Sequence, residues 1–179
     1  MTSTLQVQNL QGPTSGSNTN QVLLGSGQKI IATDQGSVVA PGMVVQVVNN
    51  TTQSYFNTTS GSFVDTPLSS SITPKSTSSK ILIEVHVQLF NGSGNQQAIA
   101  TVFRGNASTG TNLGQVNSGI GATHGGTYVK GTISGSLFDT PNTTSPVTYQ
   151  IAMRKTGNGT AYFNVNSDTS TITLMEIAQ

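Results

Sequence analysis

The sequence predicts an all-β fold, an antiparallel β-sandwich or jelly roll preceded by an extended N-terminal arm. Residues 80–90 place Ile81, Ile83, Val85, Val87 and Leu89 at every second position, which is the period of a strand with one buried face. The chain is rich in residues that suit exposed strand positions and turns, with 27 Thr, 22 Ser, 15 Asn and 20 Gly. Short apolar segments recur at intervals of roughly eight to twelve residues, as they do in sandwiches and jelly rolls.

Residues 1–42 differ from the rest of the chain and are predicted to form an arm or stalk. Leu5 and Val7 alternate with glutamines, which predicts one short strand. Two apolar pieces, 22–24 and 29–32, flank Gly25-Ser26-Gly27, which predicts a hairpin turn or kink. No piece of this arm could bury enough surface alone to offset the entropy of ordering it. We therefore expect another chain to hold the arm, with Leu5, Val7 and Leu10 as inter-subunit contacts.

The sandwich domain is predicted to span residues 43–179. Residues 43–49 are apolar on both faces apart from Gln46, which predicts a buried strand. Residues 49–62 are polar and predict a loop that carries Tyr55 and Phe56. The segment 63–74 contains Pro67 and Pro74 and therefore predicts one or two strands at a sheet edge, because proline cannot donate to a ladder.

The next segments alternate strands with one long loop. Residues 96–104 predict a strand with Ile99 and Val102 facing the core. Residues 105–126 are rich in Gly, Asn and Thr and predict the longest irregular stretch, of a length that is usually functional or loosely held. Residues 127–138 alternate again and predict a further strand.

The C-terminal third predicts three strands. Residues 147–154 alternate apolar and polar side chains, and Gly157-Asn158-Gly159 predicts a tight hairpin that pairs them with 161–165. Residues 170–178 are apolar on both sides apart from Glu176, which predicts a strand that is central or lies at a subunit interface.

The charge of the chain limits its partners. Only 7% of residues are charged and the formal net charge is +1, so no basic field is available for nucleic acid or an anionic membrane. The chain has no cysteine, so disulfides and thiolate chemistry play no part. The opening residues lack the blocks of a signal peptide, and no apolar run approaches the ~18 residues that span a bilayer. We expect no membrane insertion, and synthesis and folding in a cytoplasm.

Catalytic and metal-binding patterns are weak. His86 and His124 could bind a metal together with Glu84 if the loop folded back, although two isolated histidines are more often bystanders. The acidic residues include no close, inward-facing pair of the kind that glycoside hydrolysis needs. Asp65, Asp139 and Asp168 follow the usual pattern of carboxylates that cap turns at strand ends. Neither a phosphate-loop lysine nor a Gly-X-Ser-X-Gly elbow is present. The sequence predicts no enzyme, no cofactor and no metal.

Glu84 and Glu176 occupy strands whose other members are largely apolar. Two interpretations are open. Each carboxylate points outward or meets a partner such as Lys80, Lys130 or Arg154. Alternatively, each forms an inter-subunit ion pair that fixes the register of an oligomer, since a buried charge needs a partner.

Three segments, residues 41–48 (PGMVVQVV), 63–83 (FVDTPLSSSITPKSTSSKILI) and 170–179 (STITLMEIAQ), carry a resemblance. Together they resemble a widespread group of virion structural proteins from marine tailed phages, including cyanophages, described as tail-fibre-like or capsid-associated. The resemblance covers residues 41–179, and residues 5–12 (LQVQNLQG) are similar to the N-terminal arms of such proteins. It implies a structural protein and brings over no catalytic or ligand residue.

Two functions follow as expectations. The favoured one is a non-enzymatic virion surface protein, a homotrimer of jelly rolls that docks onto other virion proteins through its arm, either as a capsid decoration or as a tail fibre. Strands 43–49 and 170–178 have more apolar faces than one sandwich covers, which favours a symmetric partner. The alternative is a carbohydrate-binding, lectin-like module at a receptor-binding tip, contacting a host-surface glycan. Alternation places several aromatic residues in the core, leaving Tyr55 and Phe56 as the ligand contacts.

Overall fold

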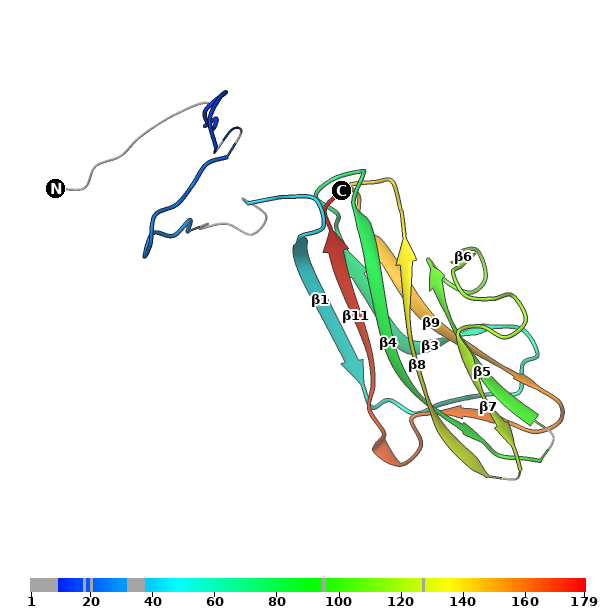
Figure 1. Cartoon of the computed structure of the whole chain (residues 1–179). Helices are drawn as coiled ribbons and strands as arrows, with labels where there is room; N and C mark the ends of the chain where they lie inside the picture. Colours follow the sequence, from blue (N-terminus) through cyan, green and yellow to red (C-terminus); the bar gives the residue numbers. More distant parts are fainter. Residues whose placement is uncertain (1–9, 18, 20, 32–37, 95, 127) are drawn as a thin grey trace. The chain divides into compact units, whose positions relative to one another are not determined.

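The computed structural model describes residues 10–17, 19, 21–31, 38–94, 96–126 and 128–179. The chain divides into two units, Met1–Asp34 and Gln35–Gln179. The second unit consists of two antiparallel sheets, which confirms the all-β prediction (Figure 1). One short 3-10 turn, Val165–Ser167, interrupts the strands. Within the ranges given above, no helix has the length and apolar character needed to cross a membrane.

The strands of the second unit are β1 (Val44–Thr52), β2 (Phe56–Thr58), β3 (Val64–Ile72), β4 (Lys80–Asn91), β5 (Gln96–Arg104), β6 (Thr111–Asn112), β7 (Gly121–Gly125), β8 (Val129–Asp139), β9 (Val147–Thr156), β10 (Ala161–Phe163) and β11 (Ser170–Ile177).

The strands form four rows in each sheet. In sheet A, β4 pairs on one edge with β8 and on the other with β11 and then β10. The outer row beyond β11 and β10 consists of β1 and β2. In sheet B the order is β3, β9, β5, with β6 and β7 sharing the last row. Three rows each contain two strands, namely β1 with β2, β6 with β7, and β10 with β11. When the eight rows are numbered in the order in which the chain forms them, sheet A has the order 1-8-3-6 and sheet B the order 2-7-4-5. This connectivity is that of a jelly roll, as predicted.

The core lies between the sheets. The five aliphatic residues of β4 at odd positions are at most 5% exposed, which confirms the predicted core strand. They pack against inward side chains of β9 and β5, including Tyr149, Met153 and Val102. Burial of one such aliphatic side chain stabilises the fold by roughly 1.5–3 kcal/mol.

The prediction that residues 43–49 form a buried strand is wrong. β1 occupies the outer row of sheet A, where Val44 and Val47 are 49% and 53% exposed. A register irregularity between Val44 and Gln46 also disturbs the alternation of this strand. The predicted edge position of 63–74 is confirmed, because β3 is the outer row of sheet B.

The predicted hairpin between 147–154 and 161–165 is wrong. The turn itself exists, since Gly157 and Gly159 have φ values of 70° and 113°. It connects β9 in sheet B to β10 in sheet A, so the chain crosses between the sheets instead of pairing with itself. The central position predicted for 170–178 is confirmed, because β11 lies between β1 and β4.

The stretch 105–126 is more regular than predicted, because it contains β6 and β7, which both pair with β5. Between β6 and β7, residues 114–119 form a loop that folds over the outer face of sheet B. There, Arg154 donates a hydrogen bond to the carbonyl oxygen of Asn117. Ile99 is 1% exposed beneath this loop, on the face of β5 opposite to Val102. The expectation that Ile99 faces the core between the sheets is therefore wrong.

The described part of the first unit is exposed and contains turns. The amide of Gln28 donates to the carbonyl oxygen of Gly25 at 3.1 Å, so the chain turns at 25–27, but not as the hairpin that was one of the two expectations. Residues 22–24 and 29–31 form no strand. Leu10 is 64% exposed, whereas Leu5 and Val7 lie outside the described residues. The contacts expected of these three residues with another chain remain a prediction.

Candidate functional site

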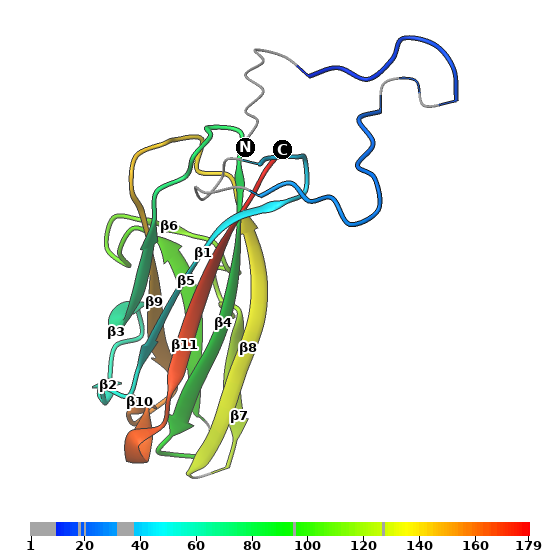
Figure 2. The same ribbon diagram turned by 90° about the vertical axis from the view of Figure 1, so that its left-hand side faces the viewer.

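The outer face of sheet A is the candidate site. The loop 114–119 covers part of the outer face of sheet B. On sheet A, β1, β11, β4 and β8 lie side by side (Figure 2), and their outward side chains are partly or fully exposed. Because side chains alternate along a strand, β4 presents Leu82, Glu84, His86, Gln88 and Phe90 on this face.

An apolar row crosses one end of this face. Strand register places Val47 of β1 beside Met175 of β11, Met175 beside Leu82 of β4, and Leu82 beside Phe138 of β8. We call these four residues the apolar row. Its two end members, Val47 and Phe138, are 53% and 65% exposed. An uncovered apolar strip of this kind marks a surface suited to another protein.

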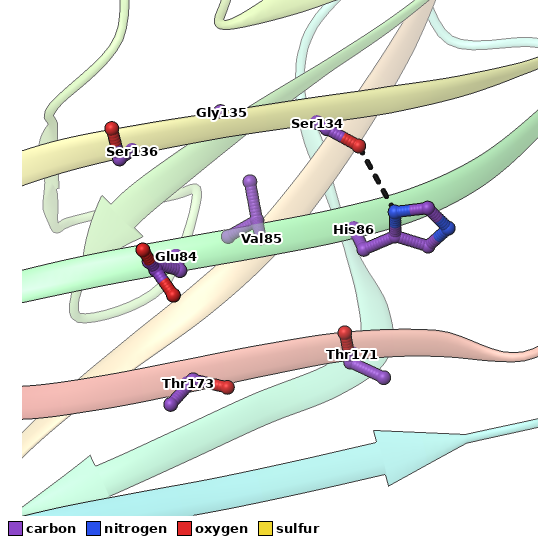
Figure 3. Close-up of a pocket in the computed structure, with 8 residues that line it drawn as sticks. All are labelled: Glu84, Val85, His86, Ser134, Gly135, Ser136, Thr171 and Thr173. Atoms are coloured by element: carbon purple, nitrogen blue, oxygen red, sulfur yellow. Dashed lines mark hydrogen bonds between the residues drawn. The ribbon is translucent and has the colours of Figure 1, made fainter.

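The middle of the face is polar and hollowed. A depression of about 470 Å³ lies over the backbone of Val85 and Gly135, because small hydroxyl side chains surround it (Figure 3). His86 Nδ1 and Ser134 Oγ share a hydrogen bond of 2.9 Å. Glu84 is the one carboxylate among the eight lining residues. The depression can therefore bind polar groups by hydrogen bonds, but it lacks the second carboxylate that glycoside hydrolysis requires.

An aromatic row crosses the other end of the face, and we define it as Tyr55, Tyr162, Phe90 and Tyr128. Successive ring centroids along it are 6.2, 5.5 and 6.0 Å apart. The end members are the most accessible, with Tyr55 55% and Tyr128 71% exposed. On β4, Phe90 of this row is eight residues from Leu82 of the apolar row, which separates the two rows by about 26 Å at roughly 3.3 Å per residue.

Sequence reasoning found one member of the aromatic row. Tyr55 is exposed as expected, whereas Phe56 begins β2 and packs against the core. The ligand contact proposed for these two residues remains a prediction. Tyr162 and Phe90 become neighbours only because β10 pairs with β4, and alternation within one strand cannot reveal that pairing. Tyr128 joins them from the turn before β8.

The two histidines lie in different sheets. His86 is on the outer face of sheet A, and His124 lies in β7 opposite Gln97 of sheet B. Across the described residues, no group of three or more His, Cys, Asp or Glu side chains is arranged to hold a metal ion.

Asp139 has a different role from the one predicted. Instead of capping a turn, it accepts hydrogen bonds from Arg104 Nη1 at 3.0 and 3.1 Å and from the Tyr149 hydroxyl at 2.8 Å. These three residues link β8 of sheet A to β5 and β9 of sheet B. Burial, and then the hydrogen bond to Asp139, raise the pKa of Tyr149 well above its ordinary value.

Two further aspartates are held in structural contacts. Asp65 accepts a hydrogen bond from the amide of Ala107 at 2.8 Å, which fits the predicted capping of a turn. Asp168 accepts one from Lys130 Nζ at 2.6 Å and forms an ion pair instead. Asp34 lies outside the described residues.

Glu176 is fully buried, so the expectation that it points outward is wrong. The expected ion pair with a Lys or Arg side chain is not formed within the described residues either. Its carboxylate accepts hydrogen bonds from Gln46 Nε2 at 2.6 Å and from the amide of Lys75 at 2.7 Å. Burial opposes its ionisation, but hydrogen bonds from Ser79, Gln46 and nearby backbone amides hold the pKa of Glu176 below its ordinary value. Glu84 is exposed, and an inter-subunit role for either glutamate remains a prediction.

No protein-family model matches the chain, and no curated protein matches it. Among solved structures, it is similar to the VP2 subviral particle of infectious bursal disease virus, with 15% identity and a TM-score of 0.47 over 93% of this chain. A structure of the Gx strain of that virus gives 14% identity and a TM-score of 0.47 over 84% of this chain. The chain spans 40% and 37% of the length of these two proteins. Likeness at this level establishes neither a shared family nor a shared function.

Proposed function

We propose that the chain is a non-enzymatic structural protein on the surface of a virus particle. In its finer form, the proposal places it on a tailed phage, as a capsid decoration or a tail fibre. The jelly-roll connectivity of sheets A and B supports the general role, because this fold is shared by viral capsid and lectin domains. Since a fold does not fix a function, the proposal rests chiefly on surface features.

The observation that carries the proposal is the exposed apolar row. It runs across the full width of sheet A, from the half-exposed Val47 to Phe138, which is 65% exposed. A second copy of the chain would remove this strip from water, at a gain of roughly 25 cal/mol for each Å² of apolar surface buried. A surface that binds the same surface on a second copy gives a symmetric dimer, and one that binds a different surface gives a closed ring when the rotation closes. A homotrimer is the form we propose.

The N-terminal arm supports docking onto neighbouring subunits or other virion proteins. Its described part carries large aliphatic side chains that are half to four-fifths exposed: Leu10, Val22, Leu23, Leu24, Ile30 and Ile31. Segments that cannot bury such residues on their own chain gain order by binding a partner. The arm, residues 1–42, is therefore proposed to be covered on the assembled particle.

The non-enzymatic part of the proposal follows from how the carboxylates are used. Asp65, Asp139, Asp168 and Glu176 each accept hydrogen bonds that stabilise a loop, a sheet contact or a strand end. Glu84 stands alone in the central depression.

Labelling of intact particles tests this function. Antibodies raised against the full chain would be applied to purified particles of a virus that encodes it, and the bound label located by electron microscopy. We expect regular labelling of the capsid or of a tail appendage, together with recovery of the chain from washed particles. Absence of the chain from purified particles, with its presence in the infected-cell lysate, would contradict the proposal.

A further inference from the structure

We infer that the aromatic row on sheet A is a binding site for a neutral glycan. This inference goes beyond the assembly role, because the aromatic row lies at the opposite end of sheet A from the apolar row. Four rings lie in one continuous series, from Tyr55 just before β2, across β10 and β4, to the turn before β8. Such a series suits an extended chain of sugar rings, whose apolar faces pack on aromatic faces.

The rings of the row are tilted against one another, and none of the three pairs is stacked in parallel. Successive ring planes meet at 37°, 60° and 31° from Tyr55 to Tyr128. A self-contained aromatic cluster would hide its members, yet both end rings are more than half exposed. The row therefore has two accessible end rings, joined by two partly buried rings, that a ligand lying along the sheet could contact.

The backbone is shaped to present these rings. Tyr128 has a φ of 63°, a left-handed conformation that bulky residues rarely adopt. Strain of this kind is found mainly at functional sites, and here it accompanies the packing of the Tyr128 ring beside Phe90. Gly92 leaves room for Tyr162, because a Cβ at this position would lie 2.7 Å from Tyr162 Cε2.

Groups that can bind sugar hydroxyls flank the rings. Asn57 is the register partner of Tyr162, and its Nδ2 donates to the Tyr55 hydroxyl at 3.1 Å. Gln88 is the next outward residue on β4, and its Oε1 accepts a hydrogen bond from Thr132 at 2.9 Å. Amides beside aromatic faces provide both the apolar contact and the hydrogen bonds that a saccharide needs.

The charge of the site favours a neutral ligand over a nucleic acid. Lys130 is the register partner of Phe90, and Asp168 neutralises it through an ion pair of 2.6 Å. Binding of single-stranded nucleic acid also uses stacking, but it requires a positively charged groove along the phosphates. The net charge of +1 for the whole chain provides no such field.

Tyrosine fluorescence gives a direct test, because the chain has no tryptophan and three of its four tyrosines belong to the aromatic row. The full chain would be titrated with laminarihexaose, mannohexaose and chitohexaose, and in parallel with a short oligothymidylate. We expect a saturable change in tyrosine emission with at least one hexasaccharide and none with the oligothymidylate.

Variants then assign the binding to the row. The variants are compared by affinity electrophoresis in gels that contain the polysaccharide from which the bound hexasaccharide derives. Tyr55→Ala and Tyr128→Ala should each bind this polysaccharide about tenfold more weakly than the unaltered chain. The matched variants Tyr55→Phe and Tyr128→Phe keep the ring and should retain binding. Light scattering should give all four variants the oligomeric state of the unaltered chain.

Three outcomes would overturn the inference. The first is that no hexasaccharide changes the emission, and the second is that only the oligothymidylate does. The third is that the two alanine variants dissociate the oligomer, which would make the row a subunit contact. None of these results bears on whether the chain is present on the particle, so the assembly role is tested separately by labelling.

Discussion

At the scale of single residues, Glu176 shows how a charge can be buried without an ion pair. Its carboxylate is surrounded by neutral donors, which stabilise the ionised form and keep its pKa below the ordinary value of 4.5. Gln46 and Lys75, which supply two of these donors, are 130 and 101 residues away in the sequence. This one side chain therefore connects β1, the turn before β4 and β11.

The first prediction concerns pH. Because the pKa of Glu176 is lower in the folded chain, its stabilisation is complete above about pH 4.5 and is lost as the pH falls through the folded value. Glu176→Gln replaces an acceptor oxygen by a donor amide and should reduce the free energy of unfolding by about 1–3 kcal/mol at pH 7. Urea denaturation should show this difference shrinking below pH 4.5.

Glu84→Gln is the matched control, because Glu84 is an exposed glutamate on the same sheet. It should leave the urea midpoint at pH 7 unchanged. Equal effects of the two substitutions at pH 7 would show that the contacts of Glu176 contribute no special stability.

Gly119 is a second residue with a large expected effect. It has a φ of 60°, and a Cβ there would lie 2.1 Å from the carbonyl oxygen of Ala100. Gly119→Ala should therefore destabilise the fold by about 2 kcal/mol or more, measured by thermal unfolding. Gly135→Ala is the control, since a Cβ at Gly135 meets nothing within 4 Å. A similar loss in both variants would argue against tight packing of the loop 114–119.

At the scale of elements, the two sheets are joined by the Arg104, Asp139 and Tyr149 contact. Tyr149→Phe removes one donor to Asp139 and should reduce the free energy of unfolding by about 1–2 kcal/mol, measured by urea denaturation. Tyr128→Phe, at an exposed tyrosine, should have no effect. In combination with Asp139→Asn, the loss should be smaller than the sum of the single losses, because both changes remove the same hydrogen bond. Strict additivity would contradict a shared contact.

Elements that depend on local pattern were predictable from the sequence, and those that depend on distant pairing were not. β4 was evident because alternation in one strand is a local property. The exposure of Val47 and the assignment of β10 to sheet A depend on which strands become neighbours. A tight turn at 157–159 suggests a hairpin, but in a jelly roll the same kind of turn can carry the chain from one sheet to the other.

The candidate site follows the same rule. The polarity of Glu84, His86 and Gln88 on one face of β4 could be read from the sequence. The apolar and aromatic rows could not, because each takes its members from four separate segments joined by register. Tyr55 was identified because a polar loop surrounds it.

At the scale of the whole molecule, the jelly roll hides most of its aliphatic residues but not all. The inner faces of both sheets form one core, and the loop 114–119 adds cover to sheet B. On sheet A, the apolar row stays exposed, which is the basis for proposing self-association. The aromatic row at the other end of that face would remain available to a ligand.

The most direct test of self-association is size-exclusion chromatography of the full chain with light scattering. We predict a mass that is a multiple of the 18.5 kDa subunit, a trimer in the proposed form. Val47→Thr with Phe138→Ser should shift the mass toward the monomer, whereas Val116→Thr, an exposed valine of the loop on sheet B, should not. A stable, soluble monomer of the unaltered chain would contradict the account.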